Sequence, residues 1–466
     1  MVFSSPIFLF IFMPSCIIIY YLFSIFKNVH IKNTVLLVFS LVFYYYGSPS
    51  FFPILLISIT INFVVCLLMA KTRNRNNKRI YLTIIVTLNI LLLFVYKYMN
   101  LFTDLITGGR FVTEIVLPIG ISFYTFQVLS YDIDVYRGDV APLKFYPDFV
   151  LYAMFFPQLI AGPIVRYKQI QVELYKRKSS FQNFTEGIYL FMIGFAKKII
   201  FANSLGLVAD YGFYNFKTEH MGLWFSSLTL ICYSIQLYLD FWAYSDMAIG
   251  LGRIFGFNFP KNFDHPFTSS SIAEFWRRWH ISLTSFFRDY VYIPLGGSRK
   301  GFIRTIINTF IIFGLSGFWH GASLNFLFWG IYFAIMIIIE RMMKYPLMIV
   351  PKTIKTIVVF IVWCISMLLF KLDKFSDIII FVSNSFKPMS ISFEMRGFIN
   401  NVYNYYFMFT FSISLLYLTR FFDKAKKWLE NRHLGIICDI VVCALFIYSC
   451  IIMLTDGFNP FLYFRF

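Results

Sequence analysis

Apolar segments about twenty residues long recur along the whole chain, as in PIFLFIFMPSCIIIYYLFSIF near the start and GIICDIVVCALFIYSCIIML near the end. A helix that crosses the hydrocarbon core of a bilayer needs about 20 mostly apolar residues. Only 14% of the 466 residues are charged, whereas a soluble domain has roughly 25%. The sequence therefore predicts an all-α, polytopic integral membrane protein. We expect residues 1–466 to form one membrane domain, whose first helix is retained because no basic stretch precedes it.

The excess of basic residues gives a formal net charge of +18 and lies in short loops between apolar segments. In a membrane protein this pattern marks cytoplasmic loops, and it argues against nucleic-acid binding. The cysteines lie in apolar segments without CxxC or histidine-paired spacing, so we expect neither a metal site nor a disulfide frame. They are Cys16, Cys66, Cys232, Cys364, Cys438, Cys443 and Cys450.

The basic clusters predict how the chain crosses the membrane. Residues 71–79, KTRNRNNKR, form the strongest cluster and are expected inside the cell, with Met1 outside. Spans are then expected near residues 81–97, 114–135, 186–204 and 222–254, and two spans should meet near residues 316–323. The count reaches about 11–12 membrane helices. It places the polar loop around Glu394 and the tail TDGFNPFLYFRF outside.

One apolar stretch, FVLYAMFFPQLIAGPIV, does not fit a simple crossing. Basic loops flank it on both sides, and both are expected to be cytoplasmic. Pro157, Gly162 and Pro163 would interrupt a helix. We therefore predict a re-entrant segment that enters the membrane and returns, surrounded by protein.

The segment EFWRRWHISLTSFFRDY is too polar to cross lipid. Helical spacing places Arg277, His280, Thr284 and Arg288 along one stripe, and this predicts an amphipathic helix on the cytoplasmic side. The polar stripe requires water, a partner charge or an anionic ligand, because a central charge costs about 2.5–3.5 kcal/mol on insertion scales. The alternative is an interfacial helix whose arginines reach the lipid headgroups.

His320 lies in GLSGFWHGASLNFLFWG, where two apolar spans are expected to meet. Its imidazole has the proton affinity that a general base needs near neutral pH. Gly317 and Gly321 are expected to leave room for a substrate. The alternative is a histidine that is hydrogen-bonded in the core of the helix bundle.

YSIQLYLDFWAYSDMAIG adds the carboxylates Asp240 and Asp246 to an apolar span, with Gln236 one turn before Asp240. These carboxylates are candidates to pair with an arginine of the polar motif or to orient a catalytic imidazole. The alternative is an internal structural salt bridge. Walker, HExxH and GxSxG motifs are absent from the sequence, which argues against an ATP-driven pump, a metalloprotease and a serine hydrolase.

FWRRWHISLTSFFRDYVYIPLGGSRKG and GLSGFWHGAS together resemble the membrane-bound O-acyltransferase family, in its bacterial branch that acylates cell-surface polymers. The resemblance extends over nearly the whole chain and implies helices around a central funnel, with a catalytic core at about residues 114–342. It implies that His320 and His280 are the catalytic histidines. Residues expected to bind the donor or support the site are Trp276, Arg277, Arg278, Arg288, Asp289, Trp319, Asn325, Asp240 and Gln236.

The same resemblance implies an O-acetyltransferase of the bacterial inner (cytoplasmic) membrane that uses acetyl-CoA as donor and holds no bound cofactor or metal. The acceptor is expected to be an extracytoplasmic glycan, with peptidoglycan ahead of alginate. A separate secreted, esterase-like (SGNH-type) transferase is the expected partner, and Tyr463 in the tail is a candidate for acyl hand-off. The tail is alternatively an aromatic membrane anchor. Competing functions are D-alanyl transfer to teichoic acid and a non-catalytic transporter or flippase.

Overall fold

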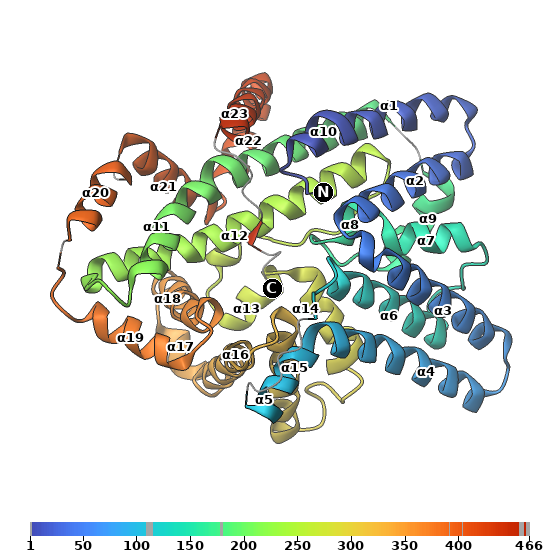
Figure 1. The fold of residues 1–466 in the computed structure, drawn as a ribbon, viewed down its shortest axis with the longest axis horizontal. Coiled ribbons are helices and arrows are strands. Elements are labelled where there is room, and N and C mark those ends of the chain that lie inside the picture. The colour runs from blue at the N-terminus through green and yellow to red at the C-terminus, as the bar shows by residue number, and fades with distance from the viewer. Residues whose placement is uncertain are drawn as a thin grey trace. The chain divides into compact units, whose positions relative to one another are not determined.

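The computed structural model describes residues 2–108, 115–177, 180–390, 392–402, 404–455 and 461–462. These residues form helices joined by turns and loops, and no strand occurs among them (Figure 1). The all-α prediction is therefore confirmed. The chain divides into two compact units, of which unit 1 comprises residues 1–191 and 244–261 and unit 2 comprises residues 192–243 and 262–466. The expectation of a single domain with a core at about residues 114–342 stays a prediction.

Unit 1 holds the N-terminal helices. Asn28 and Asn74 begin two of them, because each side chain accepts a hydrogen bond from the backbone two residues on. The helices are α1 Met13–Phe23, α2 Val29–Gly47, α3 Phe52–Lys71, α4 Arg75–Leu93, α5 Met99–Thr107, α6 Ile121–Arg137, α7 Tyr146–Met154, α8 Phe156–Leu159 and α9 Tyr167–Lys176, with most of α10 Phe181–Ala196.

Helix α6 and the segment after it belong to unit 1 and are largely buried. The expected span near residues 114–135 is a shorter helix that begins at Ile121, and almost all of its residues are buried. The predicted break of the next segment is confirmed, because α7 ends at Met154 and residues 155–165 are buried but only briefly helical. Whether this segment is re-entrant in the membrane stays a prediction.

The C-terminal part of α12 Gly222–Ile254 completes unit 1. The hydroxyl groups of Tyr20 and Tyr21 donate to the carbonyls of Phe255 and Ile254, at 2.8 and 2.7 Å. These bonds satisfy backbone acceptors that the end of a helix leaves open. They tie α1 to the end of α12.

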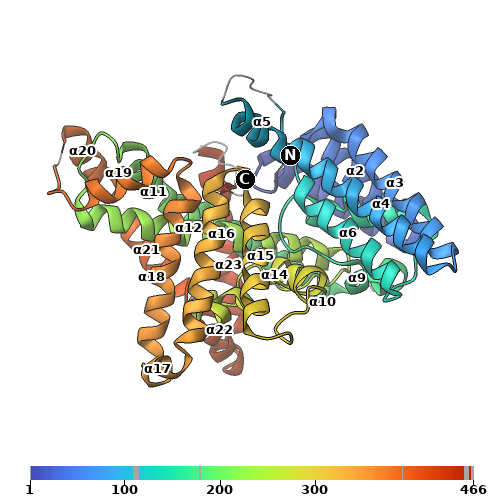
Figure 2. The same cartoon turned by 90° about the horizontal axis from the view of Figure 1, so that it is seen from below.

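Unit 2 holds the remaining helices. They are α11 Asn203–Asn215, the first part of α12, α13 Ile272–Arg278, α14 Ile281–Phe287, α15 Phe302–His320, α16 Leu324–Met342, α17 Lys344–Ile349, α18 Lys352–Lys371, α19 Phe375–Ser385, α20 Phe393–Val402, α21 Tyr405–Tyr417, α22 Phe421–Asn431 and α23 Gly435–Thr455. Figure 2 shows α15, α16 and α18 side by side. Their meeting point near residue 320 is where the sequence predicted two spans to join.

Ten helices among the described residues are long and apolar enough to cross a membrane, and α19 and α21 are shorter apolar helices. Two long spans, Phe181–Asn215 and Gly222–Ile254, are mostly buried inside the protein. The others expose apolar side chains such as Ile18, Ile57 and Ile361. A polytopic membrane protein is therefore the fold class, as predicted.

Candidate active site

His320 is the last residue of α15, and its imidazole is buried among aromatic rings. Trp319 and Trp329 lie with ring centroids 5.0 Å from it, and Phe370 of α18 lies at 5.5 Å. Only 5% of the residue is exposed. Three helices therefore enclose the side chain that the sequence singled out.

The glycines beside His320, Gly317 and Gly321, have a different structural role from the one expected. A Cβ atom at Gly317 would collide with the carbonyl oxygen of Phe326, and one at Gly321 would collide with the Phe326 ring. At Gly330 a Cβ would collide with the carbonyl of Phe313. The prediction that Gly317 and Gly321 leave room for a substrate is therefore wrong, because α16 fills that space. The glycines allow α15 and α16 to pack closely enough to fix His320.

The second histidine does not lie on a continuous helix. Helix α13 ends at Arg278 and α14 begins at Ile281, because His280 has left-handed backbone angles, with φ 44° and ψ 55°. The predicted stripe is therefore wrong: Arg277 and Arg288 are exposed, whereas His280 is 1% exposed.

The loop of residues 262–268, here called loop 262–268, holds this break. The backbone N–H of Asp264 donates to the carbonyl of Arg278 at 3.0 Å, and that of Ile281 donates to the carbonyl of Asn262 at 2.9 Å. The side-chain oxygen of Asn262 lies 3.1 Å from Nδ1 of His280 and 2.9 Å from Oγ of Ser282. Hydrogen bonds on both sides of His280 thus stabilise a backbone conformation that costs roughly 1–3 kcal/mol.

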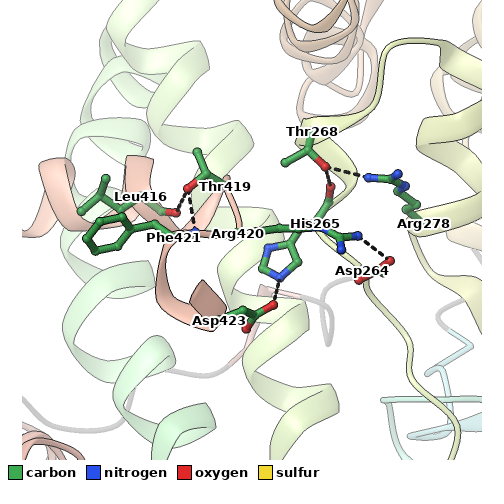
Figure 3. A network of polar contacts seen from close by, with 9 residues as sticks. All are labelled: Asp264, His265, Thr268, Arg278, Leu416, Thr419, Arg420, Phe421 and Asp423. Atoms are coloured by element: carbon green, nitrogen blue, oxygen red, sulfur yellow. Dashed lines mark hydrogen bonds and ion pairs between the residues drawn. The ribbon is translucent and has the colours of Figure 1, made fainter. Parts of the chain in front are cut away.

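Loop 262–268 is fixed on its other side by α22 (Figure 3). His265 Nε2 lies 2.8 Å from a carboxylate oxygen of Asp423, and Arg420 donates to Asp264 at 3.0 Å. Arg278 donates to the hydroxyl of Thr268 at 2.7 Å. The turn that carries His280 is therefore connected to an amphipathic helix through side-chain contacts.

Trp319 contacts both catalytic candidates. Its ring lies 5.0 Å from the His320 ring and 5.6 Å from the His280 ring, and Phe241 covers His280 at 4.7 Å. Burial lowers the pKa of the His280 imidazole well below its usual range, and the nearby His320 lowers it further. His280 is therefore neutral at physiological pH, as a buried hydrogen-bonding group has to be.

The other residues of the polar motif take local partners. Arg278 forms an ion pair with Glu274 at 2.6 Å, and Arg288 pairs with Asp289 at 2.7 Å. Trp276 is buried and packs against rings of α15 and α16. These contacts fix the motif within unit 2, and a role of the arginines in donor binding stays a prediction.

Asn325 and Gln236 also lie inside the bundle. The Asn325 side chain donates to the carbonyl of Leu372, directly after α18, and so ties α16 to α18. Gln236 packs its amide against Gly206 of α11, where the amide nitrogen lies 2.6 Å from the place of an added Cβ. Both contacts hold helices together, and a role of Asn325 or Gln236 in donor binding or in support of the site stays a prediction.

Asp240 forms a buried salt bridge, the alternative that its sequence context left open. Its Oδ1 lies 2.6 Å from Nζ of Lys198, and both side chains are 1% exposed. Its Oδ2 accepts a hydrogen bond from the backbone N–H of Leu462 at 2.8 Å, and the Phe461 ring lies over Lys198. Residues 461–462 of the tail are therefore seated on a buried ion pair. Tyr463, the candidate for acyl hand-off, lies outside the described residues.

Membrane-length helices that enclose two buried imidazoles, both in contact with one tryptophan, define a polytopic membrane protein with a histidine site. The model of the MBOAT, membrane-bound O-acyltransferase, family matches residues 38–375, which is most of the chain. The chain belongs to this family, and both histidines lie within the matched part.

The names of the relatives refer to several polymers. The probable alginate O-acetylase AlgI of Pseudomonas syringae pv. tomato is 40% identical over 352 residues, which cover 73% of this chain and 66% of that protein. The peptidoglycan O-acetyltransferase of Helicobacter pylori is 34% identical over 373 residues, covering 73% of this chain and 70% of that protein. The teichoic acid D-alanyltransferase of Bacillus subtilis is 29% identical over 229 residues, covering 47% of this chain and 57% of that protein. The chain thus spans about two thirds of the length of the Pseudomonas protein.

Sequence reasoning missed the residues that hold the histidines in place. Asn262 lies 18 positions before His280, and Phe370 lies far beyond His320 in the chain. The only available signal for Asn262 was a polar residue between Lys261 and Phe263 in NFPKNFDHPF. Contacts of this kind depend on the tertiary fold and not on local periodicity.

Proposed function

We propose that this protein takes an acetyl group from a cytoplasmic donor and passes it across the membrane for O-acetylation of an extracytoplasmic glycan. The enclosed pair His280 and His320, joined through Trp319, is the observation that carries the proposal. Relatives whose names are probable alginate O-acetylase AlgI and peptidoglycan O-acetyltransferase support the acetyl group and the glycan class. A separate secreted transferase of the SGNH type belongs to the proposal as the partner that completes transfer.

In the proposed reaction His320 is the general base. It takes the proton of an acceptor hydroxyl while the hydroxyl oxygen attacks the carbonyl carbon of the acetyl thioester of coenzyme A. The carbon–sulfur bond then breaks, and the thiolate leaves with the proton that His320 held. General base catalysis of this kind typically contributes 10²–10⁴-fold in rate.

The aromatic enclosure suits this chemistry. Trp319, Trp329 and Phe370 cover His320 with apolar surface. An imidazole in its neutral form can accept the proton of the hydroxyl at the ring nitrogen that carries no hydrogen. Exclusion of water also limits hydrolysis of the thioester.

The test is ester analysis of surface glycans from a strain that lacks the gene. We expect the wild-type protein to restore base-labile acetate, and the variant His320→Ala to lower its formation by at least about 10²-fold, the lower range for loss of a general base. His30→Ala is the matched control, since His30 is an exposed histidine of unit 1. Protein amount and thermal stability in detergent verify that both variants fold.

The assay also separates the competing functions. Release of D-alanine instead of acetate would assign teichoic acid D-alanylation, and normal acetate in His320→Ala cells would contradict a catalytic His320. Acetate in purified muropeptides identifies peptidoglycan as the acceptor, whereas acetate in secreted polysaccharide identifies an alginate-like polymer.

A further inference from the structure

The side chain of Asn262 determines which ring nitrogen of His280 carries the proton. The amide oxygen of Asn262 faces three groups, namely Nδ1 of His280 at 3.1 Å, Oγ of Ser282 at 2.9 Å and the backbone N–H of Ser282 at 3.4 Å. A backbone N–H can only donate, so the amide atom that it faces has to be the oxygen and not the nitrogen. The orientation of the Asn262 side chain is thereby fixed.

The tautomer of His280 follows from this orientation. An amide oxygen only accepts, so Nδ1 at 3.1 Å has to donate and carries the hydrogen. In a neutral imidazole the other nitrogen, Nε2, then bears a lone pair. Nε2 is buried and has no hydrogen-bond partner among the residues that the structure describes.

A buried acceptor without a partner costs roughly 1–3 kcal/mol. The backbone of His280 adds a second cost, because it is left-handed at a residue with a Cβ atom. Two unfavourable features at one residue, both maintained by Asn262 and its neighbours, are typical of a functional site. The natural relief for the lone pair is a donor group that arrives with a substrate.

We propose that Asn262 is a positioning residue for acyl transfer, which holds His280 as the Nδ1–H tautomer so that Nε2 accepts a hydrogen bond from an O–H or N–H group of a substrate. This inference rests on the proposed function for the identity of the substrates. It excludes His280 Nε2 as a donor to the developing oxyanion. Proton removal is left to His320, and the two histidines thus have different tasks.

A direct measurement of the tautomer tests the proposal without any assay of activity. The full-length protein is labelled with ¹⁵N-histidine and reconstituted in lipid, and the His280 resonances are assigned by their loss in His280→Gln. We expect a protonated Nδ1 and an unprotonated Nε2 at neutral pH. A protonated Nε2 would overturn the proposal, whatever the activity of the protein.

The variant Asn262→Asp provides the functional arm. A carboxylate at hydrogen-bond distance favours the imidazolium and raises the pKa of a histidine, by about 1–3 units for an opposite charge within about 4–6 Å. Nε2 then carries a proton below the raised pKa and no longer accepts. We expect the acid limb of the acetyl-transfer pH profile to move up by about one pH unit or more. His320, the titratable neighbour of His280, is unchanged in this variant.

Asn308→Asp is the matched control. Asn308 is fully buried on α15 and donates to the carbonyl of Gly297 at 2.9 Å, so the variant also places a carboxylate in the interior. We expect it to lower stability without moving the acid limb. An unchanged acid limb in folded Asn262→Asp would contradict the proposal, and if that variant does not fold, the tautomer measurement decides. If the wild-type protein restores no acetate, the proposed function fails, and if His320→Ala keeps full activity, only the general-base role of His320 fails. In either case a His280 tautomer as expected leaves the role of Asn262 in fixing it unchanged.

Discussion

Asp240 carries a charge in an apolar span, and Lys198 neutralises it. Both side chains are almost completely buried, and the second carboxylate oxygen binds the backbone of Leu462. The loss of one member of a buried pair costs more than the loss of both, because the remaining charge has no partner. The pair is therefore a sensitive point for the stability of unit 2.

We predict that Asp240→Asn lowers the free energy of unfolding by about 3–5 kcal/mol. The asparagine oxygen still accepts from Leu462, so the effect reports the unpaired Lys198. The double variant Lys198→Met with Asp240→Asn is expected to recover most of the loss. Thermal unfolding in detergent measures these effects.

The exposed pair of Lys426 and Glu430 supplies the control. Glu430→Gln should change stability by less than about 1 kcal/mol, as for other exposed ion pairs. A double variant no more stable than Asp240→Asn would show that the buried charge is not the cause.

The sequence predicted the positions of some buried polar residues but not their partners. The burial of His320 where two helices meet could be expected from the sequence, because an ionisable group between two apolar segments is rare. Its catalytic role stays a prediction. The partner of Asp240 could not be predicted, because Lys198 lies 42 positions earlier and nothing local links them. Asn262 was missed for the same reason, since only the fold brings it to His280.

At the scale of helices, the crossing of α15 and α16 depends on glycine. Gly317 and Gly330 lie where each helix meets a backbone carbonyl of the other. Gly314, one turn before Gly317, has only the Leu327 side chain near, at 3.7 Å from an added Cβ. Gly314 and Gly317 thus lie on the same helix but differ in the free space available to a Cβ atom.

We predict that Gly317→Ala destabilises the protein by roughly 1–3 kcal/mol, the usual cost of overpacking, and displaces His320. In this variant both the rate of acetyl transfer and the stability should decrease. Gly314→Ala should leave both unchanged or slightly improved, because alanine favours a helix by up to about 1 kcal/mol over glycine. Equal effects of the two substitutions would argue against close packing as the cause. Thermal unfolding and ester analysis provide the measurements.

The helical stripe predicted for residues 274–290 illustrates the limit of periodicity. Spacing of apolar and polar residues indicated one helix, and both halves are indeed helical. The left-handed turn at His280 arises from hydrogen bonds to Asn262 and Asp264, which the stripe does not contain. A periodic pattern therefore predicts elements better than the breaks that a tertiary contact imposes.

At the scale of the whole molecule, composition and segment length were sufficient for the fold class. Both long spans, residues 181–215 and 222–254, lie where the sequence predicted spans. The predicted bounds of the first, 186–204, were shorter than the observed helical segment. α6 was predicted as a span and is a covered helix of 17 residues. Hydropathy does not distinguish lipid from a protein interior, because both are apolar.

The predicted orientation in the membrane can be measured. In a variant without native cysteines, Arg75→Cys should react with a membrane-impermeant maleimide only after the cells are opened, since the basic loop is expected inside. Glu394→Cys should react in intact cells. Both residues are exposed in the structure. The opposite labelling pattern would reverse the orientation.

The division of the chain also sets an order of events during synthesis. Unit 1 is completed by residues 244–261, which leave the ribosome after the first part of unit 2. Within that first part of unit 2, Lys198 is synthesised before its partner Asp240. The delay is about 2–8 s for 42 residues at ~5–20 residues per second. A nascent chain that stops between these two residues therefore holds an uncompensated ammonium group, so truncated products of this length should be prime substrates for membrane proteases.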